Sequence, residues 1–321
     1  MDTCELTSAH GDAATEFSPQ FNRFVQMTSL IAWSGADTHG TASIYFASDS
    51  RISWDKLGKR VWDTAPKVLA STTQPEIFGF TGYALLPYVA LSQACMAIDR
   101  GLRGAQDEKS PDGKCDWLWN RIKTQTKMHP SGADHSFNIL YAIRTGSKAY
   151  ISRKGKEPPA YSPDEPKATF DLYVLSWDAS SEKFSEKHYG VPHSESSILK
   201  LSGTGETHVR NAHNVWEKSP GRGTSRSMFS ALCLSLETGN DPQSGGAPQL
   251  VGMYRKGNGR TFGVFTSQGA FFQGVRFSDH PGDSVEWRDQ LFRRVEFNGR
   301  LLDGARSRSS DSEWLLNPMH E

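Results

Sequence analysis

Residues 27–51, MTSLIAWSGADTHGTASIYFASDSR, contain the pattern that best defines the fold. SLIAW is a short apolar run, and SGADTHG has the Ser, Gly and Asp residues that are typical of turns. TASIYFAS is rich in β-branched and aromatic residues, which favour strands. Two such runs joined by a turn predict a β-hairpin. Thr28 precedes the hairpin, and the charged residues Asp49 and Arg51 follow it.

Length and charge limit the classes of protein that fit. The 321 residues are enough for one large domain or two ordinary domains, and 36% of them are apolar. Thirty-six Lys and Arg residues balance thirty-six Asp and Glu residues. A chain without net charge gives no electrostatic reason to expect binding to nucleic acid or to an anionic membrane. We therefore expect neither partner.

The cysteines argue against a disulfide scaffold and against structural zinc. Cys4, Cys95, Cys115 and Cys233 form no CxxC pair, and no histidine cluster accompanies them. The sequence also lacks the roughly 18 consecutive apolar residues of a membrane helix. Residues 1–26 lack the apolar core of a signal peptide. These features predict a soluble cytoplasmic protein.

Hairpins dominate the predicted order of elements along the rest of the chain. Groups of strands alternate with groups of helices, which predicts the α+β class with mainly antiparallel sheets. We expect a polar extension or propeptide over residues 1–27, one domain over 28–300 and a polar tail over 301–321. The predicted helices are 85–100, 116–127, 206–218, 225–238 and 285–297. The predicted strands after the first hairpin are 66–70, 76–80, 137–143, 148–152, 170–177, 183–189, 197–201, 249–255, 261–266 and 270–277.

Six short motifs occur in the order found in one known family. They are Thr28 at the start of a strand, ASDSR at 47–51, Lys67 in the next strand, GFTG at 79–82, SGTG at 202–205 and DPQSGG at 241–246. In these motifs the chain resembles proteasome β-type subunits and their bacterial relatives, which are N-terminal nucleophile (Ntn) hydrolases. The matches span about residues 28–255. The resemblance implies a four-layer αββα sandwich, in which two antiparallel sheets lie between helical layers.

The chain departs from the family pattern at two positions. Met27 stands where processed members have glycine before the nucleophile, and Thr204 stands where they have serine. A Met-Thr start is similar to the bacterial branch nicknamed Anbu, which has no propeptide. Three interpretations of residues 1–26 remain open: a propeptide, a genuine extension, or an upstream start codon that was wrongly chosen.

The resemblance implies that Thr28 is a nucleophile. A threonine hydroxyl needs a base to remove its proton. An N-terminal α-amino group, with a pKa of roughly 7.7–8.0, suits that task. Thr28 has such a group only if the Met27–Thr28 bond is cut or translation begins at Met27. Lys67, paired with Asp49, would lower the pKa values of the hydroxyl and the amine.

The resemblance assigns supporting roles to further residues. Thr204, Asp241 and Ser244 would orient the amine and the hydroxyl, and Arg51 would support the loop. The backbone N–H of Gly79 would stabilise the oxyanion. No metal or organic cofactor is required. The residues expected to form the pocket for the substrate side chain, with an apolar preference, are Ile52, Ile77 and Thr81.

Each of these residues also has an ordinary structural interpretation, such as β-propensity for Thr28 or a surface ion pair for Lys67 and Asp49. Three functions are consistent with the sequence. The first is a proteasome-like peptidase that acts on peptides or proteins through a threonine ester. The second is an Ntn amidohydrolase of a small molecule, and the third is a catalytically silent assembly protein. The family resemblance implies a ring or spiral homo-oligomer, and any unfoldase partner is left open.

Overall fold

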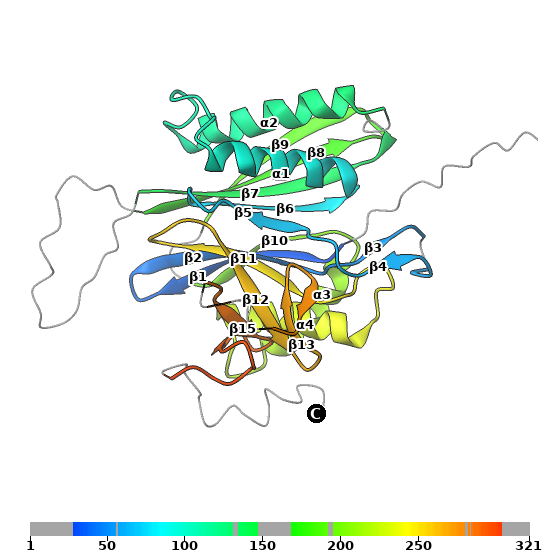
Figure 1. Cartoon of the computed structure of the whole chain (residues 1–321), viewed down its shortest axis with the longest axis vertical. Coiled ribbons are helices and arrows are strands. Elements are labelled where there is room, and N and C mark those ends of the chain that lie inside the picture. Colours follow the sequence, from blue (N-terminus) through cyan, green and yellow to red (C-terminus); the bar gives the residue numbers. More distant parts are fainter. Residues whose placement is uncertain are drawn as a thin grey trace, which may run out of the picture.

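Two β-sheets stacked face to face form the centre of the protein (Figure 1). The structure is a computed structural model that describes residues 28–55, 57–130, 134–146, 168–191, 195–279, 282 and 284–303. The first sheet has five strands, and all neighbouring strands in it are antiparallel. In spatial order they are β5 (Val68–Ala70), β6 (Glu76–Gly82), β7 (Phe137–Thr145), β8 (Thr169–Asp178) and β9 (Lys183–Gly190).

The second sheet contains the predicted hairpin as two central strands. β1 (Leu30–Asp37) pairs with β2 (Gly40–Ser48), and Leu30 lies opposite Ser48. Its described strands are antiparallel apart from the parallel pair β12 and β15. The remaining strands are β10 (Ser197–Ser202), β11 (Gln249–Tyr254), β12 (Arg260–Thr266), β13 (Gly269–Phe272), β14 (Val275–Phe277), β15 (Trp287–Asp289) and β16 (Arg294–Val295).

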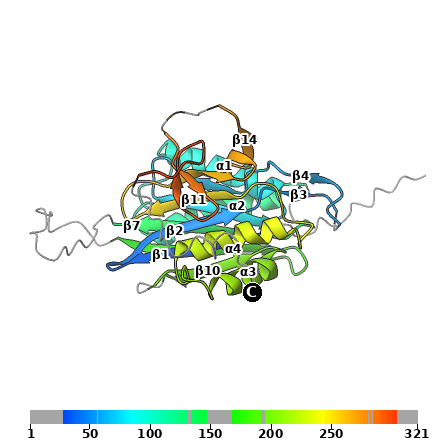
Figure 2. The same ribbon diagram turned by 90° about the horizontal axis from the view of Figure 1, so that it is seen from below.

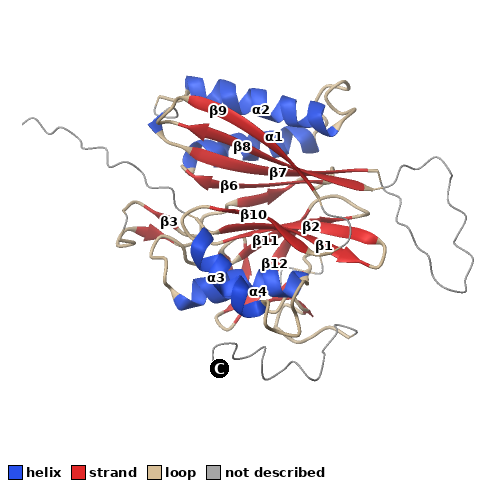
Figure 3. Cartoon of the chain, turned by 180° about the vertical axis from the view of Figure 1, so that it is seen from behind, coloured by secondary structure: helices blue, strands red, loops and turns tan. Residues whose placement is uncertain are grey.

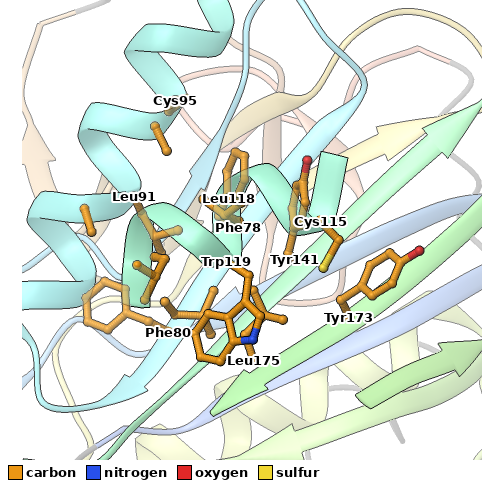
Figure 4. Packing of buried hydrophobic residues seen from close by; sticks show 14 of the residues in the cluster. Phe78, Phe80, Leu91, Cys95, Cys115, Leu118, Trp119, Tyr141, Tyr173 and Leu175 are labelled. Atoms are coloured by element: carbon orange, nitrogen blue, oxygen red, sulfur yellow. The ribbon is translucent and has the colours of Figure 1, made fainter. Parts of the chain in front are cut away.

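Helices α1 (Leu85–Asp99) and α2 (Pro111–Met128) cover the outer face of the five-stranded sheet (Figures 1 and 3). Ser110 begins α2 by accepting the N–H of Gly113, and Pro111 occupies the first turn, where its missing N–H is not needed. The apolar side chains of both helices pack on the large aromatic residues of the sheet (Figure 4). The residues at the centre of this cluster include Phe78, Leu91, Leu118, Tyr141 and Leu175.

Helices α3 (Glu206–Trp216) and α4 (Ser225–Thr238) lie side by side on the outer face of the other sheet (Figure 2). Phe229 and Leu232 of α4 pack on Ile31 and Trp33 of β1. A separate cluster fills the space between the two sheets, where Phe46 and Val251 meet Leu140 of the first sheet. The α+β class with antiparallel sheets, as predicted, is therefore confirmed.

The predicted helix at 285–297 is wrong. This segment instead forms β15 and β16, and β15 pairs with β12. Asp289 causes the reversal, because its carboxylate accepts the N–H groups of Leu291 and Arg293 at 3.0 and 2.7 Å. Trp287 and Val295 are buried in a small cluster of their own, so the apolar spacing reflects two short strands and not one helical face.

Smaller differences concern the ends of elements. The helix predicted from residue 116 begins at Pro111, and the strand predicted over 270–277 is the hairpin β13–β14. A small separate hairpin of β3 (Ile52–Ser53) and β4 (Val61–Trp62) precedes β5, in a segment where no strand was predicted. The strand predicted at 148–152 and the segments 1–27 and 304–321 lie outside the described residues.

Candidate active site

Thr28 lies at the entry to β1, where its backbone meets the loop that follows β10. Its side chain and backbone are almost wholly buried, and its carbonyl accepts the N–H of Gly205 at 3.3 Å. The next residue, Ser29, donates its N–H to Asp49 Oδ1 at 2.9 Å. The start of β1 is therefore fixed on two sides by backbone hydrogen bonds.

Asp49 is buried directly after β2, and both of its carboxylate oxygens are engaged. Oδ1 accepts the N–H of Ser29, and Oδ2 accepts the N–H groups of Arg51 and Gly245 at 3.0 and 3.1 Å. Lys67 Nζ donates to both oxygens, at 2.9 and 3.0 Å. Several donors from distant parts of the chain thus compensate one buried negative charge.

The Lys67 side chain has an exposed fraction of 1%, and that of its partner Asp49 has 0%. Burial lowers the pKa of Lys67 below its ordinary value, while the charge and hydrogen bonds of Asp49 act in the opposite direction. Gln249 fixes the lysine backbone, because its Oε1 accepts the Lys67 N–H at 2.9 Å and its Nε2 donates to Ala65 O at 2.6 Å. The lysine is therefore held in place at both ends.

Hydrogen bonds between side chains connect Thr204, Asp241 and Ser244 to the start of β1. Thr204 Oγ1 and Ser244 Oγ both donate to Asp241 Oδ2, at 3.1 and 2.7 Å. Ser29 Oγ donates to Ser244 Oγ at 2.8 Å. The hydrogen-bonded series Ser29–Ser244–Asp241 leads from the residue after Thr28 to the carboxylate of Asp241, a residue that is 7% exposed.

Two glycines of the SGTG motif allow this close approach. Gly203 has φ +94°, and a Cβ atom there would lie 1.9 Å from the Thr28 carbonyl oxygen. A Cβ atom at Gly205 would lie 1.7 Å from Ser29 Oγ. Residues with side chains would therefore push the loop away from Thr28.

A pocket of about 330 Å³ opens beside Thr28 and Lys67. Ile52, Trp54 and Trp62 of the β3–β4 hairpin line it. Gly82 and Tyr83, which precede α1, and Leu85 and Tyr88 of its first turn also line the pocket. Arg51 lies at the base of the hairpin and forms two bonds to Asp63, at 2.7 and 2.8 Å, and one to Pro242 O.

Ile77 and Thr81, which were expected to form the pocket, and Gly79, the expected oxyanion donor, are not among the described residues that line it. Among the described residues, Ile77 belongs to the cluster between the sheets, and Thr81 Oγ1 shares a 2.9 Å hydrogen bond with Ser202 Oγ. Gly79 is in the middle of β6, where a Cβ atom would meet Leu30 Cδ1 at 2.7 Å. Among the described residues of β6, Phe80 and Gly82 line the pocket. Because side chains alternate along a strand, Ile77, Gly79 and Thr81 lie on the opposite face, toward the other sheet.

The structure also brings residues to the site that the sequence did not single out. Ser29, Asp63 and Gly82 participate directly in its contacts or lining. Gly82 is the second glycine of the GFTG motif, and its position just before α1 could have identified it from the sequence. Trp54 and Trp62 lie in a segment without a clear strand pattern, so their proximity to Thr28 had no signal in the sequence.

The described part of the chain contains no group of three His, Cys, Asp or Glu residues arranged to hold a metal ion. None of its helices is long and apolar enough to cross a membrane. Cys95, Cys115 and Cys233 are buried free thiols. Burial raises the pKa of Cys95 to about 12, which makes this thiol a poor nucleophile.

Comparison with known proteins gives matches only among solved structures. No protein-family model matches the sequence, and no curated protein matches it. Anbu (ancestral beta-subunit) from Yersinia bercovieri is similar with a TM-score of 0.44 and 12% identity, over 72% of this chain and 86% of that one. Eukaryotic HslV from Trypanosoma brucei is similar with a TM-score of 0.38 and 11% identity, over 71% of this chain and 99% of that one. Likeness at this level does not establish membership of either protein's family.

Proposed function

We propose that the protein is a proteasome-like Ntn hydrolase that cleaves peptide bonds with Thr28 as its N-terminal nucleophile. The αββα layering typical of that superfamily is part of the proposal. One observation carries it: the buried Lys67–Asp49 pair lies at a pocket that Thr28 also lines. A buried ion pair is weak evidence for a purely stabilising role, so its position at the pocket that Thr28 lines favours a chemical role.

The proposed reaction is acyl transfer through an ester. Thr28 Oγ attacks the substrate carbonyl carbon, and its proton passes to the α-amine of Thr28. The C–N bond of the substrate then breaks, and the departing amine takes that proton. Water attacks the ester and gives one proton back through the amine to Oγ, which releases the acid. The nearby Lys67 ammonium favours the anionic form of the hydroxyl and stabilises developing negative charge.

Thr204, Asp241 and Ser244 act as positioning residues in this proposal. Their hydrogen bonds reach Ser29, the residue after the nucleophile, and so fix where the amine lies. Arg51 supports the same loop through its bond to Pro242 O at 3.1 Å. Efficient attack requires the reacting groups to be held at the correct distance and angle, so this support affects the reaction rate as well as the stability of the fold.

We assign the oxyanion donor to the backbone of Gly82 in place of Gly79. Phe80 donates its N–H to Lys67 O at 3.1 Å, on the β5 side of β6. Successive N–H groups along a strand point in alternating directions, so the N–H of Gly82 points toward the β5 edge of β6, as that of Phe80 does. Gly82 lies past the first residue of β5, Val68, so no β5 residue is opposite its N–H. That side borders the pocket, which Gly82 lines together with Thr28 and Lys67.

The test of this function is the N-terminal sequence and intact mass of the protein isolated from its native host. We expect a mature chain that starts at Thr28, because an internal threonine has an amide where the mechanism needs an amine. A stable chain that starts at Met1 contradicts the mechanism. Thr28→Ala supplies the matched variant, which should assemble normally and have no hydrolytic activity.

The proposal also covers the cellular location and the oligomeric state of the enzyme. We propose a cytoplasmic ring or spiral of identical subunits that encloses the pocket. Light scattering of the purified protein should give a mass that is a multiple of the single chain, and a monomer would contradict this. A small-molecule amidohydrolase would share the chemistry, but no described contact specifically favours it.

A further inference from the structure

We infer that the pocket beside Thr28 selects a substrate with a large aromatic or branched apolar side chain, and that Trp54 and Trp62 are the selecting residues. The inference rests on the proposed function, since it names the substrate class of the same site. Both tryptophans line the pocket, yet 37% of Trp54 and 49% of Trp62 is exposed. Large apolar side chains left this exposed around a concavity are typical of binding surfaces.

The hairpin that carries the tryptophans is fixed at its base. β3 and β4 pair only with each other among the described strands, so the main sheets do not hold them. Two bonds join the Arg51 guanidinium to the Asp63 carboxylate across the ends of the hairpin. Ser50 Oγ also donates to Asp63 O at 2.6 Å. The base therefore positions the tryptophans over the pocket.

The tip of the hairpin is fixed as well. The Asp55 carboxylate accepts the N–H groups of Leu57, Lys59 and Arg60 at 2.9, 3.0 and 2.8 Å. Trp54 N–H donates to Arg60 O at 2.9 Å. A wall that is rigid before the substrate arrives loses little conformational entropy on binding, which increases selectivity for shape.

The start of α1 presents further apolar groups to the same pocket. Tyr83, Leu85 and Tyr88 line the pocket from the start of α1. An aromatic substrate ring that packs edge-to-face or offset against the tryptophan and tyrosine rings gains binding energy beyond that from the apolar area it buries. The volume of about 330 Å³ is at the lower end of the range for small-ligand sites, as expected for one bulky side chain.

The charges at the pocket argue against an ionic substrate side chain. Among the described lining residues, the charged ones are Arg51 and Lys67. Arg51 is bonded to Asp63, and Lys67 is bonded to Asp49. A charged side chain entering the pocket would lose its hydration, and both charged groups that it could meet there are already paired. The pocket thus favours apolar side chains because it disfavours charged ones and because its lining makes apolar contacts.

The experiment uses the protein as isolated from its host and fluorogenic peptides that differ only in the residue before the cleaved bond. We expect kcat/KM to be highest for Phe or Leu and lowest for Glu or Lys. Trp62→Ala and Trp54→Ala should lower kcat/KM for the Phe peptide roughly tenfold or more. The same variants should leave the Ala peptide nearly unchanged. Val61→Ala is the matched control, because Val61 neighbours Trp62 but is not among the described residues that line the pocket.

Two outcomes would overturn the inference: an equal loss for the Phe and Ala peptides, or no loss with either tryptophan variant. A binding measurement separates this failure from failure of the proposed function. Calorimetry with the Thr28→Ala protein and the uncleaved Phe peptide should show weaker binding when Trp62→Ala is added. That result supports the pocket assignment even if no peptide is hydrolysed, and unchanged binding contradicts it.

Discussion

At the scale of single residues, the Lys67–Asp49 pair is the most informative feature of the protein. The sequence placed both residues near Thr28 by resemblance, and the structure brings them to 2.9 Å from one another in a buried site. The sequence could not reveal the role of Gln249. The side chain of this β11 residue fixes the backbone of Lys67, although the two residues are 182 positions apart. Such a contact depends on strand order, which a single sequence does not encode locally.

The pair should show strong energetic coupling. We expect Lys67→Met and Asp49→Asn each to lower the free energy of unfolding by about 3 kcal/mol or more, because each leaves a buried group without its partner. The double variant should cost clearly less than the two single variants added together. Chemical denaturation of the four proteins measures this, and strict additivity would contradict the coupling. Arg210→Met, in an exposed pair with Glu206, is the control and should change stability little.

At the scale of elements, periodicity predicted the long elements well and the short ones poorly. The helix expected over 225–238 matches α4, where Gly239 follows the last turn. The segment 285–297 has a similar spacing of apolar residues, but Asp289 accepts two backbone N–H groups and closes a turn between short strands. Local hydrogen bonds of an aspartate side chain therefore overrode the helical pattern.

The loop after β10 provides a test of how the elements position the site. Gly203→Ala should displace the loop from Thr28, since its Cβ atom would lie 1.9 Å from the Thr28 carbonyl oxygen. We expect loss of activity together with a lower melting temperature. Gly190→Ala, where no atom lies within 4 Å of the new Cβ, is the control and should behave as the original protein does. A fully active Gly203→Ala protein would show that the loop does not fix Thr28.

At the scale of the whole molecule, the site is assembled from segments that lie far apart in the chain and from both sheets. Thr28 and Asp49 flank the β1–β2 hairpin, Lys67 precedes β5 of the other sheet, and Asp241 follows α4. The inter-sheet cluster holds these segments at a fixed separation. The resemblance predicted the convergence of Thr28, Asp49 and Lys67 but not the pocket walls, which the small β3–β4 hairpin and the start of α1 provide.

The reactivity of Thr28 as an N-terminal nucleophile can be tested with a reagent that needs both its hydroxyl and its amine. A peptide epoxyketone can form a ring with a hydroxyl and an amine on adjacent carbons, so it distinguishes an N-terminal threonine from an internal one. The protein isolated from its host is treated with this reagent and digested, and the adduct is located by mass spectrometry. We predict a single adduct on the peptide that begins at Thr28, and none in the Thr28→Ala protein. An adduct on another residue, or no adduct at all, would contradict the account.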